Sequence, residues 1–156
     1  MLVVARHLDG RKIKGQTTDF HPAREYFRVR TSLERPPLEV STTGMKAVFC
    51  VRSLEGGNPE RQDHREFPRN SGQVRRKVWL EFKDGECMAA WPVSMPLGKE
   101  GFWVIPTDPT SNVEKAYVFR DAVTKILQGD KAVIAAYSER ERLRAGVREA
   151  VVLRVL

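Results

Sequence analysis

The amino-acid sequence predicts a mainly β protein, built from two diverged copies of one small unit and followed by a helical tail. An Asp-Gly pair at Asp9-Gly10 recurs 75 positions later at Asp84-Gly85, and apolar and polar residues alternate on the N-terminal side of each pair. After Asp130 the alternation gives way to a helical period. Because Asp-Gly between two extended runs is a strong local signal for a β-hairpin, the repeat in the letters predicts a repeat in structure.

The same offset aligns Phe27-Arg28-Val29 with Phe102-Trp103-Val104, and each copy then continues through a polar break into two further extended runs. Residues 1–52 and 74–130 therefore each predict five short strands, with no room for a crossover helix, so the strands must pair antiparallel. A sheet this small is best stabilised by curling, which also limits its exposed edges. We expect two tandem SH3-like or Sm-like small barrels, packed together. The later strands are expected at Leu38–Val40 and Met45–Val51, and at Ala116–Phe119 and Val123–Leu127.

The two remaining segments differ from the β units in composition. Residues 53–73 are rich in Gly, Pro, Arg and Glu and predict a linker or an extended loop. In residues 131–156, Ser138 with Glu141 three positions later fits a capping box, which predicts the start of a helix at Ser138. Its predicted apolar face consists of Val133, Tyr137, Leu143, Val147 and Val151. The last residues, 151–156, are rich enough in valine to fit a strand as well as a helix.

Composition and length place the chain in the ordinary globular class. Of its 156 residues 41% are apolar, too many for a disordered chain, and no apolar run approaches the roughly 20 residues that cross a bilayer. The first residues are expected to form a strand and not a signal peptide, so a cytoplasmic protein is expected. Cys50 and Cys87 each sit in an apolar run, which predicts buried thiols and no disulfide.

The net charge of +7 raises the question of nucleic-acid binding. Residues 1–52 hold ten basic against five acidic residues and residues 131–156 six against three, while residues 74–130 balance at eight against eight. Nucleic-acid binders more often concentrate their basic residues on one face, whereas here they are interspersed with acids. The charge therefore indicates only a weak preference for anionic partners, carried by the first unit and the tail.

A set of short motifs in both units resembles a bacterial domain family of unknown function. The resemblance covers most of residues 1–130 and implies a duplicated small β-barrel fold, without implying an activity, a cofactor or a partner. In the first unit it is carried by Asp9-Gly10-Arg11, Lys14-Gly15, Thr18-Asp19-Phe20, Pro22, Phe27 and residues 45–52, and Gly57-Asn58-Pro59 extends it. In the second it is carried by residues 82–86, 101–106, Asp108-Pro109 and Ser111-Asn112.

No arrangement of side chains in the sequence predicts catalysis, a metal or a cofactor. The three histidines lack the spacing that directs two imidazoles at one metal ion, no Gly-x-Ser-x-Gly marks a nucleophile, and no phosphate-binding Gly-rich loop is present. Arg61 and Arg65 fit the Arg-x-x-x-Arg with which PilZ-type barrels bind a cyclic dinucleotide, but the second motif of those receptors is missing. We therefore expect a non-catalytic protein, with a cyclic-dinucleotide receptor as a lesser alternative.

The candidate binding residues are Tyr26, Arg28 and Arg30, with Trp103 at the equivalent of Arg28 in the second copy. Period two places the first three on one face of a strand, and Phe27 and Val29 on the other. We expect a binding module of a bacterial regulatory or assembly system that contacts a protein through this face, Trp103 and the Gly- and Arg-rich linker with Arg61 and Arg65. The alternative is RNA or single-stranded DNA, with a base stacked on Tyr26. The apolar tail also allows a homodimer.

Overall fold

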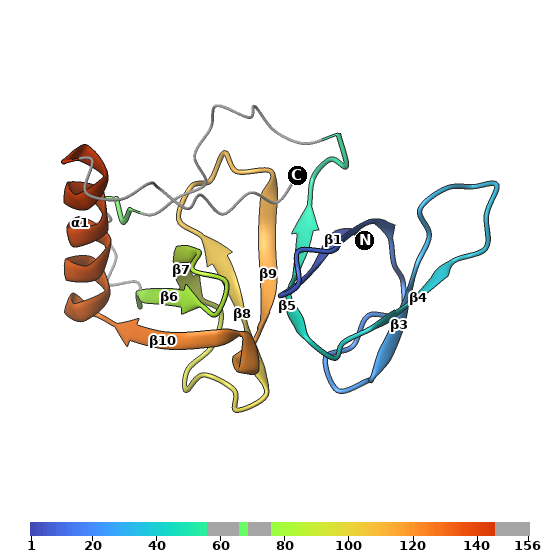
Figure 1. The fold of residues 1–156 in the computed structure, drawn as a ribbon, viewed down its shortest axis with the longest axis horizontal. Helices are drawn as coiled ribbons and strands as arrows, with labels where there is room; N and C mark the ends of the chain where they lie inside the picture. Colours follow the sequence, from blue (N-terminus) through green and yellow to red (C-terminus); the bar gives the residue numbers. More distant parts are fainter. Residues whose placement is uncertain (56–65, 69–75, 146–156) are drawn as a thin grey trace.

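The computed structural model describes residues 1–55, 66–68 and 76–145. These form ten strands, one short 3₁₀ helix at Arg120–Ala122 and a C-terminal helix (Figure 1). The strands of the first half are β1 (Leu2–His7), β2 (Lys12–Gln16), β3 (Tyr26–Val29), β4 (Leu38–Ser41) and β5 (Met45–Val51). Those of the second half are β6 (Val78–Phe82), β7 (Cys87–Pro92), β8 (Gly101–Pro106), β9 (Val113–Phe119) and β10 (Val123–Gln128), and the helix is α1 (Asp130–Arg144).

The prediction of five strands in each copy is confirmed. Both Asp-Gly pairs form the turns of β-hairpins, and Gly10 and Gly85 adopt φ values of 93° and 88°. Only glycine takes this left-handed conformation without strain, which is why the same dipeptide occurs at both turns. In each half the last strand pairs with the first and the first with the second, while the third pairs with the fourth.

The sheet that these strands form is not a pair of closed barrels. β5 pairs antiparallel with β9, from Ala47 opposite Val118 to Val51 opposite Val113. This contact joins the halves into one eight-stranded antiparallel sheet of order β10-β6-β7-β8-β9-β5-β1-β2, beside which β3 and β4 form a small sheet of their own. The barrel prediction is not confirmed in the described residues, because the edges of β5 and β9 satisfy each other across the halves.

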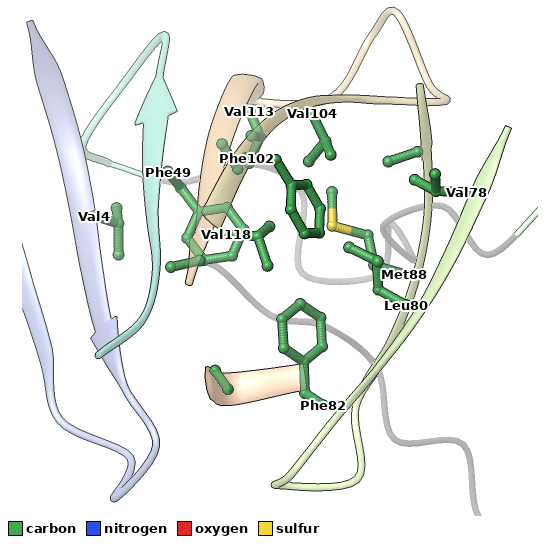
Figure 2. Close-up of a cluster of buried hydrophobic side chains, with 14 of the residues drawn as sticks. Val4, Phe49, Val78, Leu80, Phe82, Met88, Phe102, Val104, Val113 and Val118 are labelled. Atoms are coloured by element: carbon green, nitrogen blue, oxygen red, sulfur yellow. The ribbon is translucent and has the colours of Figure 1, made fainter. Parts of the chain in front are cut away.

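The main hydrophobic core is shared by both halves. Val4 and Phe49 from the first half pack in one buried cluster with Leu80, Phe102 and Val118 from the second (Figure 2). A second cluster lies between β1, β5 and the β3–β4 sheet and contains Phe27 and Val29. The first-half strands β1 and β5 therefore bury side chains on both of their faces, which explains why every residue of β5 is buried.

A β-bulge directs a lysine into this interior. The β1–β5 ladder pairs Arg6 with Ala47 and His7 with Met45, so Lys46 is an extra residue on β5. Bulges change the direction of the side chain that they insert. Lys46 is fully buried as a result, and Arg6 on the neighbouring strand is 7% exposed.

These two cations meet two carboxylates from the turn of the β6–β7 hairpin. The Lys46 ammonium donates to Asp84 over 2.6 Å and also to Glu86, and it lies 4.5 Å from the centre of the Phe82 ring. Arg6 donates through two nitrogens to the two carboxylate oxygens of Glu86. A buried charge is tolerated only when it is paired, so this cluster ties the first half to the second.

The helix α1 begins eight residues before the predicted start. It starts after Gly129, whose φ of 61° turns the chain out of β10, and Ser138 lies inside the helix and not at its N-cap. The predicted apolar face is also wrong. The helix packs small side chains, Ala132 and Ala136, against Trp79 of β6, because small residues let it approach the sheet closely. Val147 and the rest of residues 146–156 lie outside the described residues.

Candidate binding surface

The alternation predicted for β3 is confirmed. Phe27 and Val29 are 1% and 0% exposed, whereas Tyr26 is 51% exposed and Arg28 and Arg30 are also on the surface. Within the described residues, the side chains of Arg28 and Arg30 form no hydrogen bond or ion pair. Strand geometry thus presents one aromatic ring and two available guanidinium groups on the same side.

Two backbone contacts fix the position of β3. The carboxylate of Asp19 accepts a hydrogen bond of 2.9 Å from the backbone N–H of Arg28. At the other end, Gln16 and Arg30 exchange two backbone hydrogen bonds of 3.0 and 2.8 Å. Gly15 allows this approach, since a Cβ at that position would collide with the carbonyl oxygen of Arg30.

The bridge between Gln16 and Arg30 extends the candidate surface to two residues of β2 that the sequence analysis did not single out. Residues directly opposite in an antiparallel bridge point to the same side of the sheet. Gln16 and Lys14, which is also exposed, therefore continue the outer face of β3 onto β2. Glu39, opposite Arg28 on β4, contributes one negative charge to the same face. The surface is basic overall and not uniformly so.

The β3–β4 hairpin projects from the body of the molecule, at the end opposite α1 (Figure 1). Its loop carries Leu33, which is 91% exposed, and β4 begins with Leu38, which is 50% exposed. Among the described strands, β4 pairs only with β3, so its other edge is open. We name the exposed residues Tyr26, Arg28, Arg30, Leu33 and Leu38 the hairpin surface, in which Leu38, opposite Val29, lies on the other side of the hairpin from Tyr26 and Arg28.

Trp103 on β8 is half-buried in a cluster of aromatic rings. Its ring lies 5.4 Å from that of Tyr117 and 6.1 Å from that of Phe20, both nearly perpendicular to it. The ammonium of Lys115 lies 4.7 Å from its centre. These contacts use much of the indole to join β8 and β9 to the first half.

The structure does not bring Trp103 to the outer face of β3. Trp103 instead contacts Phe20, and the ring of Phe20 lies 4.9 Å from that of Phe27 on the inner side of β3. Phe27 points to the opposite side of β3 from Tyr26. The four described candidate residues therefore divide into a surface on β3 and a packed aromatic cluster beneath it.

The structure does not describe the other two sequence-based candidates. Arg61 and Arg65 lie outside the described residues. In the part of the chain that the structure describes, no group of three or more His, Cys, Asp or Glu residues could hold a metal ion. Both cysteines are buried and free, as predicted, and burial raises the pKa of the Cys50 thiol.

A second surface feature is a hollow of about 450 Å³ between β7 and β8. It is lined by Trp91, Val93, Met95 and Ile105, with Arg76 at its border. Val93 and Ile105 are 55% and 41% exposed. The hollow brings one cation near apolar side chains, but without converging polar groups of the kind that an active site requires.

Part of the positive charge of the first half is buried and unavailable to a partner. Arg6 and Lys46, two of its ten basic residues, are buried against Asp84 and Glu86 of the second half. They therefore do not contribute to a surface that could attract an anionic partner. Nothing in the sequence distinguished them from exposed basic residues, because both stand in alternating strand patterns.

The fold and the surface define a mainly β protein with one continuous antiparallel sheet and a projecting hairpin. The chain belongs to a family of unknown function, DUF6982, whose model matches residues 2–128. No curated protein and no solved structure shows a significant match to it. No helix within the described ranges is long and apolar enough to cross a membrane.

Proposed function

We propose that this protein is a non-catalytic binding module, with a regulatory or assembly role, that contacts a protein partner through the hairpin surface. The observation that carries the proposal is the projecting β3–β4 hairpin, which exposes Tyr26, Arg28 and Arg30 on its outer face, Leu33 in its loop and Leu38 on its other side. Within the described residues, neither guanidinium group is paired. Tyrosine and arginine are the residue types that most often dominate protein interfaces. An exposed leucine at the tip gains most from being covered.

The open edge of β4 supports the same proposal. Its unpaired backbone groups can accept an added strand from a partner, a mode of recognition in which the backbone supplies affinity and neighbouring side chains supply specificity. Leu38 lies on β4, directly beside the place of such a strand, whereas Tyr26 lies one strand further away on β3. Native proteins usually protect an open edge, so an open edge on a projecting hairpin favours a binding role.

We further infer that each half derives from an SH3-like or Sm-like unit. The support is the pairing order, which is the same in both halves except that β7 and β8 form a ladder where β2 and β3 share a single bridge. On this proposal the second half uses its third and fourth strands, β8 and β9, to build the large sheet. The first half has its β3–β4 pair available for binding, since β3 is attached to β2 only by the bridge between Gln16 and Arg30.

The test begins with capture of partners from native cell extract and continues with the purified partner. The variant Leu33→Asp, and separately Tyr26→Ala, should weaken the measured affinity by roughly tenfold or more. Val93→Asp is the matched control, because Val93 is also exposed but lies in the hollow between β7 and β8. Equal binding by the Leu33→Asp and Tyr26→Ala variants and the unchanged chain would refute the proposal.

Single-stranded nucleic acid is a second candidate, favoured by the continuity of Lys14, Arg30, Arg28 and Tyr26 on one face. A base could stack on Tyr26 while the three cations contact phosphates. Affinity for a labelled oligonucleotide should then fall steeply with added salt, and each lost phosphate contact should reduce the slope by about 0.7. Arg28→Gln and Arg30→Gln should each show this reduction, whereas Leu33→Asp should not. Absence of binding at low salt eliminates this candidate.

A further inference from the structure

The helix α1 presents its large apolar side chains to solvent. Ala132 and Ala136 are 0% and 3% exposed against the sheet, whereas Val133, Ile134 and Tyr137 are 39%, 64% and 60% exposed. In a helix that packs on a sheet, large apolar residues ordinarily face inward. Here the outward face has three of the nine large apolar side chains that the described residues leave exposed.

Charged residues at the two ends of the helix share this outward face. Asp130, Tyr137 and Arg144 are spaced seven residues apart, which places them along one side of a helix. Asp130 is in the first turn and Arg144 is in the last, with the apolar side chains between them, so opposite charges stand at the two ends of the face; within one copy Arg144 also lies 3.8 Å from the carboxylate of Glu141. Such a face is complementary to its own copy when the copy runs in the opposite direction.

We propose that this face binds a second copy of the chain, with the two α1 helices antiparallel about a two-fold axis at Tyr137. In this arrangement Asp130 of each copy lies opposite Arg144 of the other, and the Ile134 side chains lie on either side of the axis. A hollow of about 180 Å³ between Phe67 and α1, lined also by Val133 and Tyr137, provides space for an aliphatic side chain from the second copy. The charged ends of the face, together with its apolar side chains, therefore favour a second copy of the chain as the partner.

The size of the helix limits the strength of this dimer. Fifteen residues extend about 22 Å, so one helix pair covers less surface than most permanent interfaces. We therefore expect a reversible dimer whose population rises with concentration. Because α1 and the hairpin surface lie at opposite ends of the molecule, each dimer would carry two free hairpin surfaces (Figure 1).

The first test measures mass by sedimentation equilibrium over a wide range of concentrations. The unchanged chain should approach twice its monomer mass, and Ile134→Glu should weaken the association by roughly tenfold or more, since it would bury an unpaired carboxylate. Val93→Glu is the matched control, because Val93 is also an exposed apolar residue but lies at the hollow between β7 and β8 and not on α1. A monomer at every concentration would overturn the proposal.

The second test uses charge reversal and separates a second copy from every other occupant. Asp130→Arg alone and Arg144→Asp alone each place like charges opposite one another in both pairs, and each should weaken its own dimer by roughly tenfold. Mixed together, the two variants place opposite charges at both pairs, so they should associate with each other. Circular dichroism checks that both retain the helix, because Asp130→Arg also opposes the helix dipole.

Two outcomes of the mixing experiment contradict the proposal. Failure of the mixture to associate, while the unchanged chain dimerises, would mean that the dimer uses another face. Loss of the dimer on removal of residues 146–156, with no effect of either charge reversal, would assign the contact to that segment and not to α1.

Discussion

The guanidinium of Arg6 donates to both carboxylate oxygens of Glu86, each over 3.1 Å, although the two residues are 80 positions apart in the chain. This contact joins the first strand of one half to the hairpin turn of the other. Together with Lys46 and Asp84 it forms a buried polar cluster at the edge of an otherwise apolar shared core. The relative placement of the halves therefore depends on charge pairing as well as on hydrophobic packing.

Replacing Lys46 by Met should destabilise the protein by about 3–5 kcal/mol, because it removes one member of a buried charge cluster, leaving Asp84 without its cation and Glu86 with Arg6 alone. The measurement is urea unfolding followed by tryptophan fluorescence. Arg11→Met is the matched control, since Arg11 pairs with Asp9 at the equivalent turn of the first half but in an exposed position. That control should leave the free energy of unfolding nearly unchanged, because solvent screens an exposed ion pair. Equal costs would show that the cluster does not hold the halves together.

Gly15→Ala should loosen the attachment of the β3–β4 hairpin. The new Cβ would collide with the backbone of Arg30 and with the side chain of Val29, so β3 must move away from β2. We expect a loss of about 1–3 kcal/mol in unfolding free energy and faster amide exchange in β3. Gln16→Ala is the control. Because the Gln16 side chain is exposed, this substitution should change neither the free energy of unfolding nor the amide exchange of β3. Unchanged exchange in β3 of the Gly15→Ala protein would contradict the proposed attachment.

The raised pKa of Tyr117 predicts that the folded protein loses stability at alkaline pH. Burial raises the pKa of its phenol, and the nearby Glu100 carboxylate raises it further. The folded chain thus holds this proton more tightly than the unfolded chain does, so unfolding becomes easier as the pH rises above the ordinary tyrosine pKa of about 10. Below that pH the phenol has no such effect. Tyr117→Phe should remove this part of the pH dependence in thermal unfolding measured between pH 8 and pH 11.

The thiol of Cys50 should react slowly in the folded protein. Burial raises its pKa, so little of the reactive thiolate is present, and the side chain is only 3% exposed. Cys87 is also buried. Labelling with a thiol reagent at pH 8 should therefore be slow in buffer and rapid in denaturant. Rapid labelling in buffer, retained in a Cys87→Ala variant, would show that Cys50 is accessible.

The strands could be predicted because their signals are local. The two Asp-Gly turns and the alternation in β3 depend on neighbouring residues alone, and all three match the structure. The joining of β5 to β9 depends on which edges remain unpaired after each half has formed, and no local pattern reports that. The closed barrels were an extrapolation from each half taken alone.

The helix and the buried cations were mispredicted or missed for a different reason. The capping-box residues Ser138 and Glu141 have the right spacing, but the helix starts where Gly129 reverses the chain and alanines meet Trp79. Lys46 has the sequence context of an exposed strand residue, and only the bulge turns it inward. In each case a tertiary contact overrides a local preference. On the candidate surface, Leu33 and Lys14 were missed because exposure follows from the projecting hairpin and from the β2–β3 bridge.

The pairing of β5 with β9 has a consequence for how this protein is made. The ribosome completes β5 before it begins β9, so in the nascent first half the edge of β5 that later pairs with β9 is open, and Lys46 is the one charged residue of that strand. Contacts between positions as distant as Ala47 and Val118 also form slowly, because a long segment of chain must first be closed into a loop. Until then the exposed edge of β5 can pair with another chain. We therefore expect the first half, expressed alone, to aggregate, and the whole chain to pass through its most vulnerable state during synthesis.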